Sequence, residues 1–279
     1  MKVAKTIAAV RTLVRRAARP VVLVPTMGAL HHGHAALIRR ARKLAGSDGF
    51  VVVSIFVNPT QFGPKEDFSK YPRTLASDKA LCREAGADLI FHPEVATMYA
   101  SDASVFIDEC RLSDGLCGAS RPGHFRGVCT VVAKLFLIVQ PEIAVFGQKD
   151  WQQLAVIRRM VRDLDFPVKI VGHPTVREAD GLATSSRNRY LTPEERLAAP
   201  GIYKALRTAA GAKTPAAVLR IATRAITAIP GARIDYIQLV DSETLQPVRN
   251  LKRPTTLATA VFLGRARLID NIQVPAIIS

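Results

Sequence analysis

Residues 21–42, VVLVPTMGALHHGHAALIRRAR, contain the strand-to-helix transition that decides the fold. Residues 21–25 suit a buried strand, a short loop with Gly28 follows, and a helical pattern begins within His31–His34. Beyond it, apolar residues recur at helical spacing and basic residues occupy the other helix face. A strand feeding a helix across a glycine-bearing turn brings free backbone N–H groups and the positive helix end to one point. The stretch therefore predicts an anion site, which we interpret as a phosphate cradle.

Two histidines strengthen this interpretation. His31 and His34 are three residues apart, so their side chains can share one face of the first helical turn and add donors. A single histidine here is more often a capping or structural residue. A pair at this spacing, directly after a buried strand, favours ligand binding over that alternative.

Further apolar runs predict the rest of the sheet. Runs at 50–57, 88–91, 142–146 and 168–171 alternate with segments of helical character at 73–85, 128–139 and 151–164. Strands that are apolar throughout and separated by helices indicate a parallel sheet covered on both faces. The polar segments after these strands would border one crevice at the carboxyl edge of the sheet. They comprise the histidine loop, Asn58–Gln61, His92, Gly147–Asp150 and Pro174–Glu178.

The character of the chain changes after about residue 176. A helix opens near 192–195, another spans about 215–228, and residues 234–240, 257–263 and 267–272 form a predicted strand meander. The fold class is therefore α/β, a Rossmann-like parallel-sheet domain with a smaller C-terminal α/β domain. We place the first at 1–176 and the second at 177–279, packed beside the crevice.

Composition sets the class of protein. The 279 residues are 48% hydrophobic and 22% charged, as in ordinary globular enzymes, and no apolar run is long enough to span a bilayer. The first twenty residues are basic and free of acids, which also suits a targeting segment. They lack a long apolar core and lead straight into a strand, so we predict an N-terminal helix and a cytoplasmic protein. The four cysteines show no zinc-type spacing and are expected to be free thiols.

The formal charge of +16 raises a second function class, a basic nucleic-acid-binding protein. Residues 1–47 contain ten Lys or Arg and no Asp or Glu. Much of this charge falls on the solvent face of two predicted helices, where a hydrated surface is the ordinary interpretation. An anionic small substrate, such as a nucleotide, is served by the same positive field, and we expect no nucleic-acid partner.

The ordered motifs resemble the pantothenate synthetase family, ATP-dependent ligases within the H-x-G-H nucleotidylyltransferase superfamily. The resemblance runs nearly from end to end. The matching stretches are PTMGALHHGH (25–34), SIFVNPTQF (54–62), DFSKYPRT (67–74), RPGHFRGV (121–128), FGQKDWQQ (146–153), PTVRE (174–178), DGLATSSRNRYL (180–191) and DYIQLVD (235–241). A different H-x-G-H transferase that makes a dinucleotide is the alternative enzyme class, but it needs a site for a phosphate-bearing acceptor.

The resemblance implies the activity. Pantoate attacks the α-phosphorus of ATP to give pantoyl adenylate and pyrophosphate, and β-alanine then displaces AMP to give pantothenate. Protein groups mainly position the reactants and supply cations and donors. ATP is a substrate, Mg²⁺ is expected with few protein ligands, and a homodimer is implied.

The resemblance also assigns residues. The catalytic set comprises His31, His34, Lys149, Ser185, Ser186 and Arg187. The ATP-binding set comprises Met27, Gly28, Ala29, Leu30, His31, His32, Gly33, His34, Gly147, Gln148, Lys149, Asp150, Val176, Thr184, Ser185, Ser186 and Arg187. Gln61 and Gln153 bind pantoate, and Gln61 also binds β-alanine. His32 is expected to point away from the phosphates, Arg121 and His124 resemble further pocket residues, and the metal ligands are unknown.

Two positions depart from the family pattern. The family more often has Glu at the position of Gln148, and Met at that of Thr184. The first change removes a charge near the triphosphate, and the second places a smaller, polar side chain beside Ser185. Residues 59–73 suit a mobile flap over the pocket, or, alternatively, a solvated loop.

Overall fold

The computed structural model describes residues 1–64, 66 and 68–277, which form two compact units. The first unit comprises Met1–Cys110, Arg121–Gln148 and Gln153–Pro174. The second comprises Arg111–Ser120, Lys149–Gln152 and the described residues from Thr175 onward. Two short segments thus belong to the second unit although they precede Pro174 in the chain.

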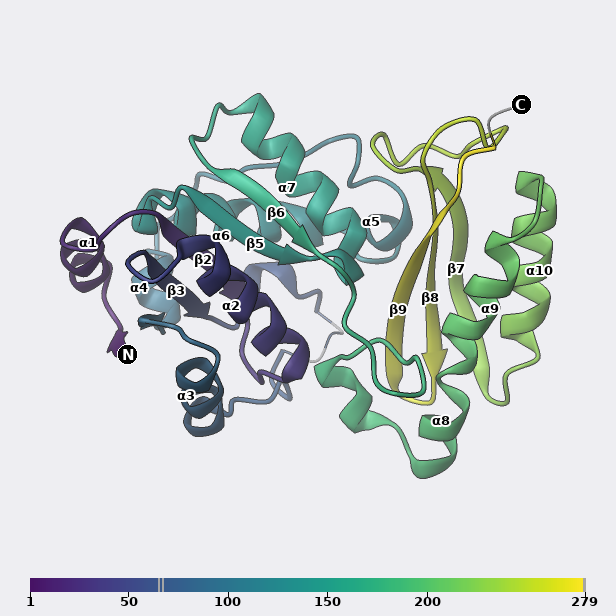
Figure 1. Ribbon diagram of the computed structural model, residues 1–279, viewed down its shortest axis with the longest axis horizontal. Coiled ribbons are helices and arrows are strands. Elements are labelled where there is room, and N and C mark those ends of the chain that lie inside the picture. The colour runs from purple at the N-terminus through teal and green to yellow at the C-terminus, as the bar shows by residue number, and fades with distance from the viewer. Residues whose placement is uncertain (65, 67, 278–279) are drawn as a thin grey trace. The chain divides into compact units, whose positions relative to one another are not determined.

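The first unit contains a six-stranded sheet in which every neighbouring pair is parallel, as expected from the uniformly apolar strands. Its order is β1-β4-β3-β2-β5-β6 (Figure 1). The strands are β1 (Lys2–Ala4), β2 (Val21–Thr26), β3 (Phe50–Ile55), β4 (Leu89–Phe91), β5 (Ile143–Gly147) and β6 (Lys169–His173). β1 was not predicted, because three residues with two exposed side chains give no strand pattern.

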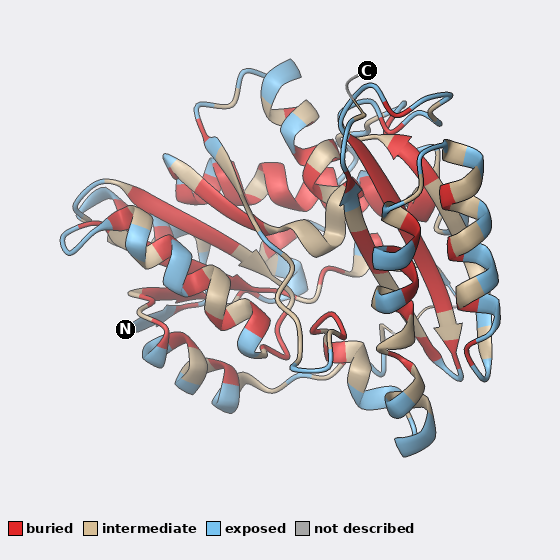
Figure 2. Ribbon diagram, turned by 45° about the vertical axis from the view of Figure 1, so that its right-hand side comes forward, coloured by how far each residue is buried: buried red, intermediate tan, exposed pale blue. Residues whose placement is uncertain are grey.

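Helices cover both faces of this sheet. They are α1 (Ile7–Arg15), α2 (His32–Ala45), α3 (Leu75–Glu84), α4 (Val95–Met98), α6 (His124–Val139) and α7 (Trp151–Asp163). Val22 and Val24 of β2 share a core with Ile38 of α2, so the alternating Val21 and Leu23 face the other side. These β2 residues are fully buried on both faces, and the strand cores are red in Figure 2.

The predicted N-terminal helix is present as α1. Thr6 caps it, because its hydroxyl accepts a hydrogen bond from the backbone N–H of Ala9 at 3.3 Å. Val10 and Val14 are its buried residues, whereas its basic side chains lie on the exposed face. In the described part of the chain, no helix combines the length and apolarity needed to cross a membrane.

Strand order places the histidine loop. β2 lies between β3 and β5, and the chain leaves it toward β3 and returns later on its other side at β5. This reversal makes the carboxyl end of β2 the topological switch point, the usual ligand position in open parallel sheets. The loop of residues 27–31 leaves the sheet at that point.

The second unit is built on a three-stranded antiparallel sheet, the predicted meander, in the order β7-β8-β9. Its strands are β7 (Ala232–Asp241), β8 (Thr255–Leu263) and β9 (Ala266–Val274). Its helices are α5 (Leu116–Ser120), α8 (Pro193–Ala198), α9 (Gly201–Ala210) and α10 (Pro215–Thr227). α9 and α10 lie side by side against the sheet (Figure 1), and Leu206, Ile226 and Val261 are fully buried in their shared core.

Candidate functional site

The loop after β2 has an unusual backbone. Gly28 has φ +93° and Ala29 has φ +49°, both in the left-handed region. A Cβ at Gly28 would lie 3.0 Å from Ile55 Cγ2 and 3.2 Å from Asp78 Oδ2, so glycine is required for space as well as conformation. His31 then takes an extended conformation as the N-cap of α2.

The two predicted histidines lie together at the start of α2. The ring centroids of His31 and His34 are 4.0 Å apart, and the backbone N–H of His31 donates to Nδ1 of His34 at 3.4 Å. Because Nδ1 accepts, the neutral His34 ring carries its proton on Nε2 and can donate it. His32 is exposed, and its ring centroid is 6.3 Å from that of His31.

Asp78 of α3 corrects the expectation of free N–H groups in this loop. Its carboxylate accepts hydrogen bonds from the backbone N–H of Ala29 at 3.1 Å and of Leu30 at 2.8 Å. Two donors assigned to the anion cradle are therefore already bound within the protein. The histidine side chains and the first turn of α2 are what this loop presents to an anion.

Gln61 follows β3, in a 3₁₀ turn spanning Pro59–Gln61. Its Oε1 accepts from Asn58 Nδ2 at 3.1 Å, and its Nε2 lies 2.9 Å from the sulfur of Met27. Asn58 Nδ2 also donates to the carbonyl of Gly127 in α6 at 3.1 Å. The structure thus brings Gln61 and Met27, two predicted site residues, into contact and fixes the orientation of the Gln61 carboxamide.

Arg121 connects the Gln61 turn with Glu66. Its guanidinium donates to both carboxylate oxygens of Glu66, at 2.7 and 2.6 Å, and to Nε2 of His124 at 3.0 Å. Because Arg121 can only donate, His124 Nε2 accepts, and its Nδ1–H donates to the Gln61 carbonyl at 2.9 Å. Burial raises the pKa of Glu66, but hydrogen bonding to Arg121 and the positive charge of Arg121 outweigh this and lower the pKa of Glu66 overall.

In the predicted flap, 59–73, positions 65 and 67 lie outside the described residues.

The segment after β5 carries four predicted site residues. Gly147 ends β5, and the next three residues, Gln148–Asp150, form a 3₁₀ turn. A Cβ at Gly172 of β6 would lie 3.2 Å from Gln148 Nε2, so the Gln148 carboxamide lies over β6. Gln153 is half-buried on α7.

Lys149 and Asp150 belong to the second unit, where the last strand holds the backbone of Lys149. Lys149 Nζ is 3.4 Å from Asp150 Oδ2, and both side chains are partly exposed. Asn271 of β9 donates from Nδ2 to the Lys149 carbonyl at 2.9 Å. Gln152 then accepts from the backbone N–H of Cys117 and donates to two carbonyls of the 111–120 segment.

The loop containing Thr184–Arg187 is held by a buried ion pair in the same unit. Arg177 donates to both oxygens of Asp270 on β9, at 2.7 and 2.8 Å, and its guanidinium lies 3.5 Å from the ring centroid of Tyr203. The backbone N–H of Thr184 donates to the carbonyl of Val176 at 2.9 Å, and this hydrogen bond joins the two ends of the 176–184 segment.

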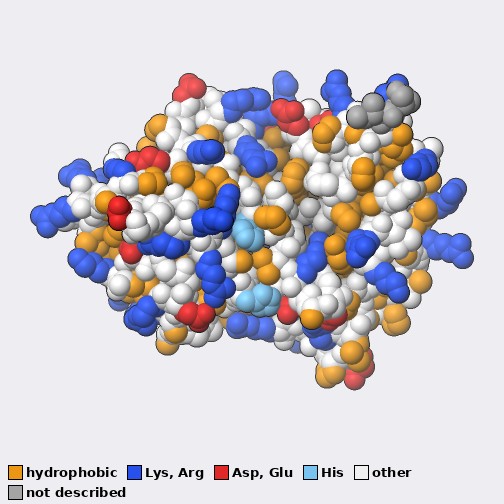
Figure 3. Space-filling model, viewed as in Figure 1, with side chains coloured by type: hydrophobic (Ala, Val, Ile, Leu, Met, Phe, Trp, Pro, Cys, Tyr) orange, Lys and Arg blue, Asp and Glu red, His pale blue; other side chains and the backbone are white. Residues whose placement is uncertain are grey.

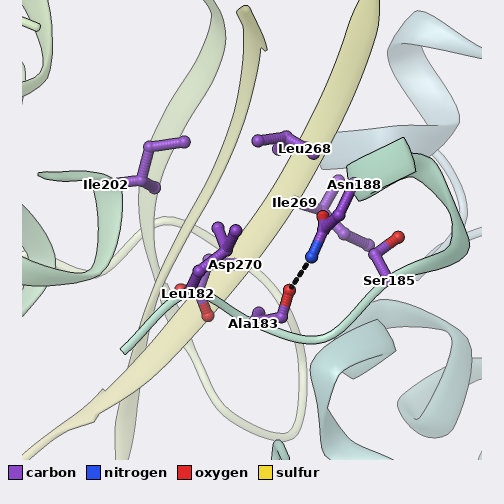
Figure 4. A pocket seen from close by; sticks show the side chains of 8 residues that line it. All are labelled: Leu182, Ala183, Ser185, Asn188, Ile202, Leu268, Ile269 and Asp270. Carbon is purple, nitrogen blue, oxygen red and sulfur yellow. Dashed lines mark hydrogen bonds between the residues drawn. The ribbon is translucent and has the colours of Figure 1, made fainter. Parts of the chain in front are cut away.

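Within this loop, Ser185 caps a 3₁₀ turn at Ser186–Tyr190, because its Oγ accepts from the Arg187 backbone N–H at 3.2 Å. Asn188 donates from Nδ2 to the Ala183 carbonyl at 3.1 Å beside a narrow cavity (Figure 4). That cavity is lined by Leu182, Ala183, Ser185, Asn188, Ile202, Leu268, Ile269 and Asp270. Thr184 and Ser186 are buried.

Positive charge is widely distributed. Lys and Arg side chains are scattered over the face shown in Figure 3, and acidic side chains are fewer there. Among the described residues, no group of three His, Cys, Asp or Glu side chains could hold a metal ion.

The parallel sheet, with an H-x-G-H loop at its switch point, defines the class as an α/β protein of the nucleotidyltransferase type. The sequence pattern of the pantoate-beta-alanine ligase family matches residues 2–273. The chain therefore belongs to the pantoate–β-alanine ligase family.

Individual relatives agree with this assignment. The pantothenate synthetase of Akkermansia muciniphila is 55% identical over 91% of this chain and 92% of its own length. The pantothenate synthetase of Moorella thermoacetica is 52% identical over 98% of both chains. A crystal structure of the Thermus thermophilus pantothenate synthetase superimposes with a TM-score of 0.92 at 49% identity, covering 99% of this chain and 100% of that one.

A pantoate-beta-alanine ligase from Francisella tularensis, whose structure is described as complexed with beta-gamma ATP and beta-alanine, matches with a TM-score of 0.81. It is 33% identical, and the match covers 98% of this chain and 97% of that one.

Sequence reasoning missed the residues that hold the loops. Asp78, Gln152, Arg177, Asp270 and Asn271 are distant in sequence from most groups that they contact. Asp78 lies in the first turn of α3, where an acidic residue is ordinary, so its burial has no local signature.

Proposed function

We propose that this ligase joins pantoate to β-alanine in two steps, through pantoyl adenylate. Family membership supports the overall ATP-dependent reaction, and the observation that carries the site assignment is the His31–His34 pair. The His31 backbone N–H occupies Nδ1 of His34, so a neutral His34 carries its proton on Nε2 and brings a donor to the start of the helix.

In the first step, a pantoate carboxylate oxygen forms a bond to the α-phosphorus of ATP, and the bond to the bridging oxygen of pyrophosphate breaks. Negative charge grows on the departing oxygens. We assign His31, His34, Lys149 and Arg187 to that charge, with the hydroxyls of Ser185 and Ser186 as further donors. The other predicted ATP contacts surround the nucleotide, with Asp150 at the ribose and Val176 at the adenine.

In the second step, the β-alanine amine attacks the activated carbonyl, loses a proton, and AMP leaves. We assign Gln61 to pantoate and β-alanine, and Gln153 to pantoate. The contacts of Gln61 with Asn58 and Met27 support the first assignment, because they hold its carboxamide in one orientation without using all of its hydrogen-bonding capacity.

We also propose that Mg²⁺ accompanies ATP, bound mainly by phosphates and water. Mg²⁺ in nucleotide sites characteristically keeps water and phosphate ligands, so it needs few ligands from the protein. Such an ion neutralises part of the phosphate charge. A homodimer in the cytoplasm completes the proposal, and light scattering of the purified chain tests its oligomeric part.

The decisive experiment measures AMP release from ATP with pantoate, β-alanine, both or neither. We expect rapid AMP release only with both, and exchange of labelled pyrophosphate into ATP with pantoate alone. AMP formation independent of β-alanine, or none under any condition, contradicts the proposed reaction.

A further inference from the structure

A buried carboxylate lies beneath the histidine loop. Asp78 is 1% exposed, and its three donors are all neutral: the Ala29 and Leu30 backbone N–H groups and the Thr74 hydroxyl at 3.0 Å. An ionised carboxylate removed from water requires such donors, and its hydrogen bonds are stronger than those between neutral groups. Asp78 also lies in the first turn of α3, where the helix dipole favours negative charge.

The charge of Asp78 acts on its surroundings. Burial, as the larger cause, and the negative charge of Asp78, as the smaller one, raise the pKa of the Cys82 thiol to about 12. Cys82 therefore stays protonated at neutral pH, and Asp78 faces a neutral neighbour one helical turn away. The carboxylate and its hydrogen bonds connect α3 with Ala29 and Leu30 of the loop.

The loop conformation depends on these hydrogen bonds. Ala29 adopts a left-handed φ of +49°, which a residue with a Cβ rarely takes without external support. Asp78 binds the N–H of Ala29 itself and that of Leu30, directly before His31. The carboxylate therefore holds the two residues that directly precede His31, the N-cap of α2.

We propose that Asp78 is a positioning residue for the ATP-binding histidine loop. It holds Ala29 and Leu30 so that His31 and His34 present their donors from the first turn of α2. It also occupies two N–H groups and places a negative charge behind the loop, which excludes phosphate from that side. The inference rests on the proposed role of His31 and His34 in ATP binding.

Asp78→Asn is the primary test, because it keeps one acceptor oxygen but presents an NH₂ group to one of the two loop N–H groups. We expect the KM for ATP to rise and kcat for pyrophosphate exchange to fall, by roughly 10- to 100-fold in kcat/KM. The KM for pantoate should rise less than that for ATP, because the contacts of the Gln61 turn with Asn58 and His124 do not involve the histidine loop. Asp78→Ala should be more severe, and Thr74→Val, which removes a bond that is not to the loop, milder.

Asp88→Asn is the matched control. Asp88 also accepts from a backbone N–H, that of Val51 at 2.8 Å, and pairs with Arg42. It precedes β4, whereas the histidine loop that Asp78 binds follows β2, so the two carboxylates lie near opposite ends of the parallel strands. We expect Asp88→Asn to lower the melting temperature and leave the KM for ATP unchanged.

Calorimetric titration with ATP separates this proposal from the proposed function. Asp78→Asn should weaken ATP binding by roughly tenfold relative to wild type and Asp88→Asn. A variant that melts earlier but keeps wild-type ATP affinity and kinetics overturns the positioning role. A wild-type chain that binds ATP but performs no exchange contradicts the proposed reaction instead, and the titration still decides the role of Asp78.

Discussion

The two units hold their candidate ATP-binding loops by different means. In the first unit, one buried carboxylate, Asp78, accepts hydrogen bonds from two neutral backbone N–H groups of a strand-to-helix loop. In the second, neighbouring residues of β9 hold the segments: Asp270 pairs with Arg177 and Asn271 binds the Lys149 carbonyl. The first arrangement shapes a turn that the local sequence already favours. The second acts across larger separations along the chain, 93 and 122 residues against 49 and 48, so it depends more on the tertiary fold.

Breaking the buried ion pair should have the largest effect. Arg177→Ala leaves Asp270, with a side chain 5% exposed, without its cation, and should destabilise the second unit by about 3–5 kcal/mol. Thermal unfolding measures the loss of stability. Pyrophosphate exchange measures the loss of activity that follows if the 184–187 loop is displaced. Arg196→Ala is the control, because its pair with Asp180 is 36% and 41% exposed and should contribute at most about 1 kcal/mol. Equal losses in both variants would contradict the contrast between the two pairs.

Removing the histidine donor should act on catalysis rather than on folding. His34→Ala is expected to lower kcat for pyrophosphate exchange by about 10²- to 10³-fold, about 3–4 kcal/mol in the barrier, as for loss of one transition-state donor. Arg40→Ala, at an exposed position of the same helix, should stay within about twofold. A wild-type rate of exchange in His34→Ala removes this residue from the mechanism.

The Asn271 contact should have a moderate effect. Asn271→Ala removes the donor to the Lys149 carbonyl and should cost about 1 kcal/mol, seen as a few-fold rise in the KM for ATP. Gln273→Ala is the control on the same strand, since its amide bonds to Thr256 rather than to a site segment. If the two variants raise the KM equally, β9 does not position Lys149 specifically.

The smallest effect is expected from Glu66, whose lowered pKa predicts a pH dependence. Its ion pair with Arg121 contributes fully above the ordinary pKa of 4.5, and the contribution is lost as pH falls through the lower folded-state pKa. Glu66→Gln should reduce stability at pH 7 by about 1 kcal/mol or less and flatten the acid limb of the stability curve. Unfolding by urea between pH 7 and pH 3 measures both, and an unchanged acid limb contradicts this assignment.

Much of the fold followed from local pattern. The run 21–25 and the helical spacing after His34 correspond to β2 and α2, and the later apolar runs correspond to β3, β4, β5 and β6. α9 was missed because Pro200 and Gly201 open it directly after α8, where breakers favour a loop. α5 was missed because five residues give no readable period.

The site was predictable only in part. Residues at the ends of strands could be named, because parallel strands present their carboxyl ends at one edge and the motifs are contiguous. The assumption of free N–H groups in the glycine loop was wrong at Ala29 and Leu30, since their acceptor lies about fifty positions further along the chain. No local pattern encodes a contact of that range.

The sequence by itself determined the alternation of strands and helices, the H-x-G-H loop with its histidine spacing, and the family, because these depend on periodicity and on contiguous motifs. Only the tertiary structure decided which groups hold those motifs in place. Asp78 under the loop, and Asp270 and Asn271 behind the Arg177 and Lys149 segments, act through hydrogen bonds between residues far apart in the chain. Such hydrogen bonds form only after the hydrophobic cores have brought the elements together, so their partners cannot be inferred from local sequence.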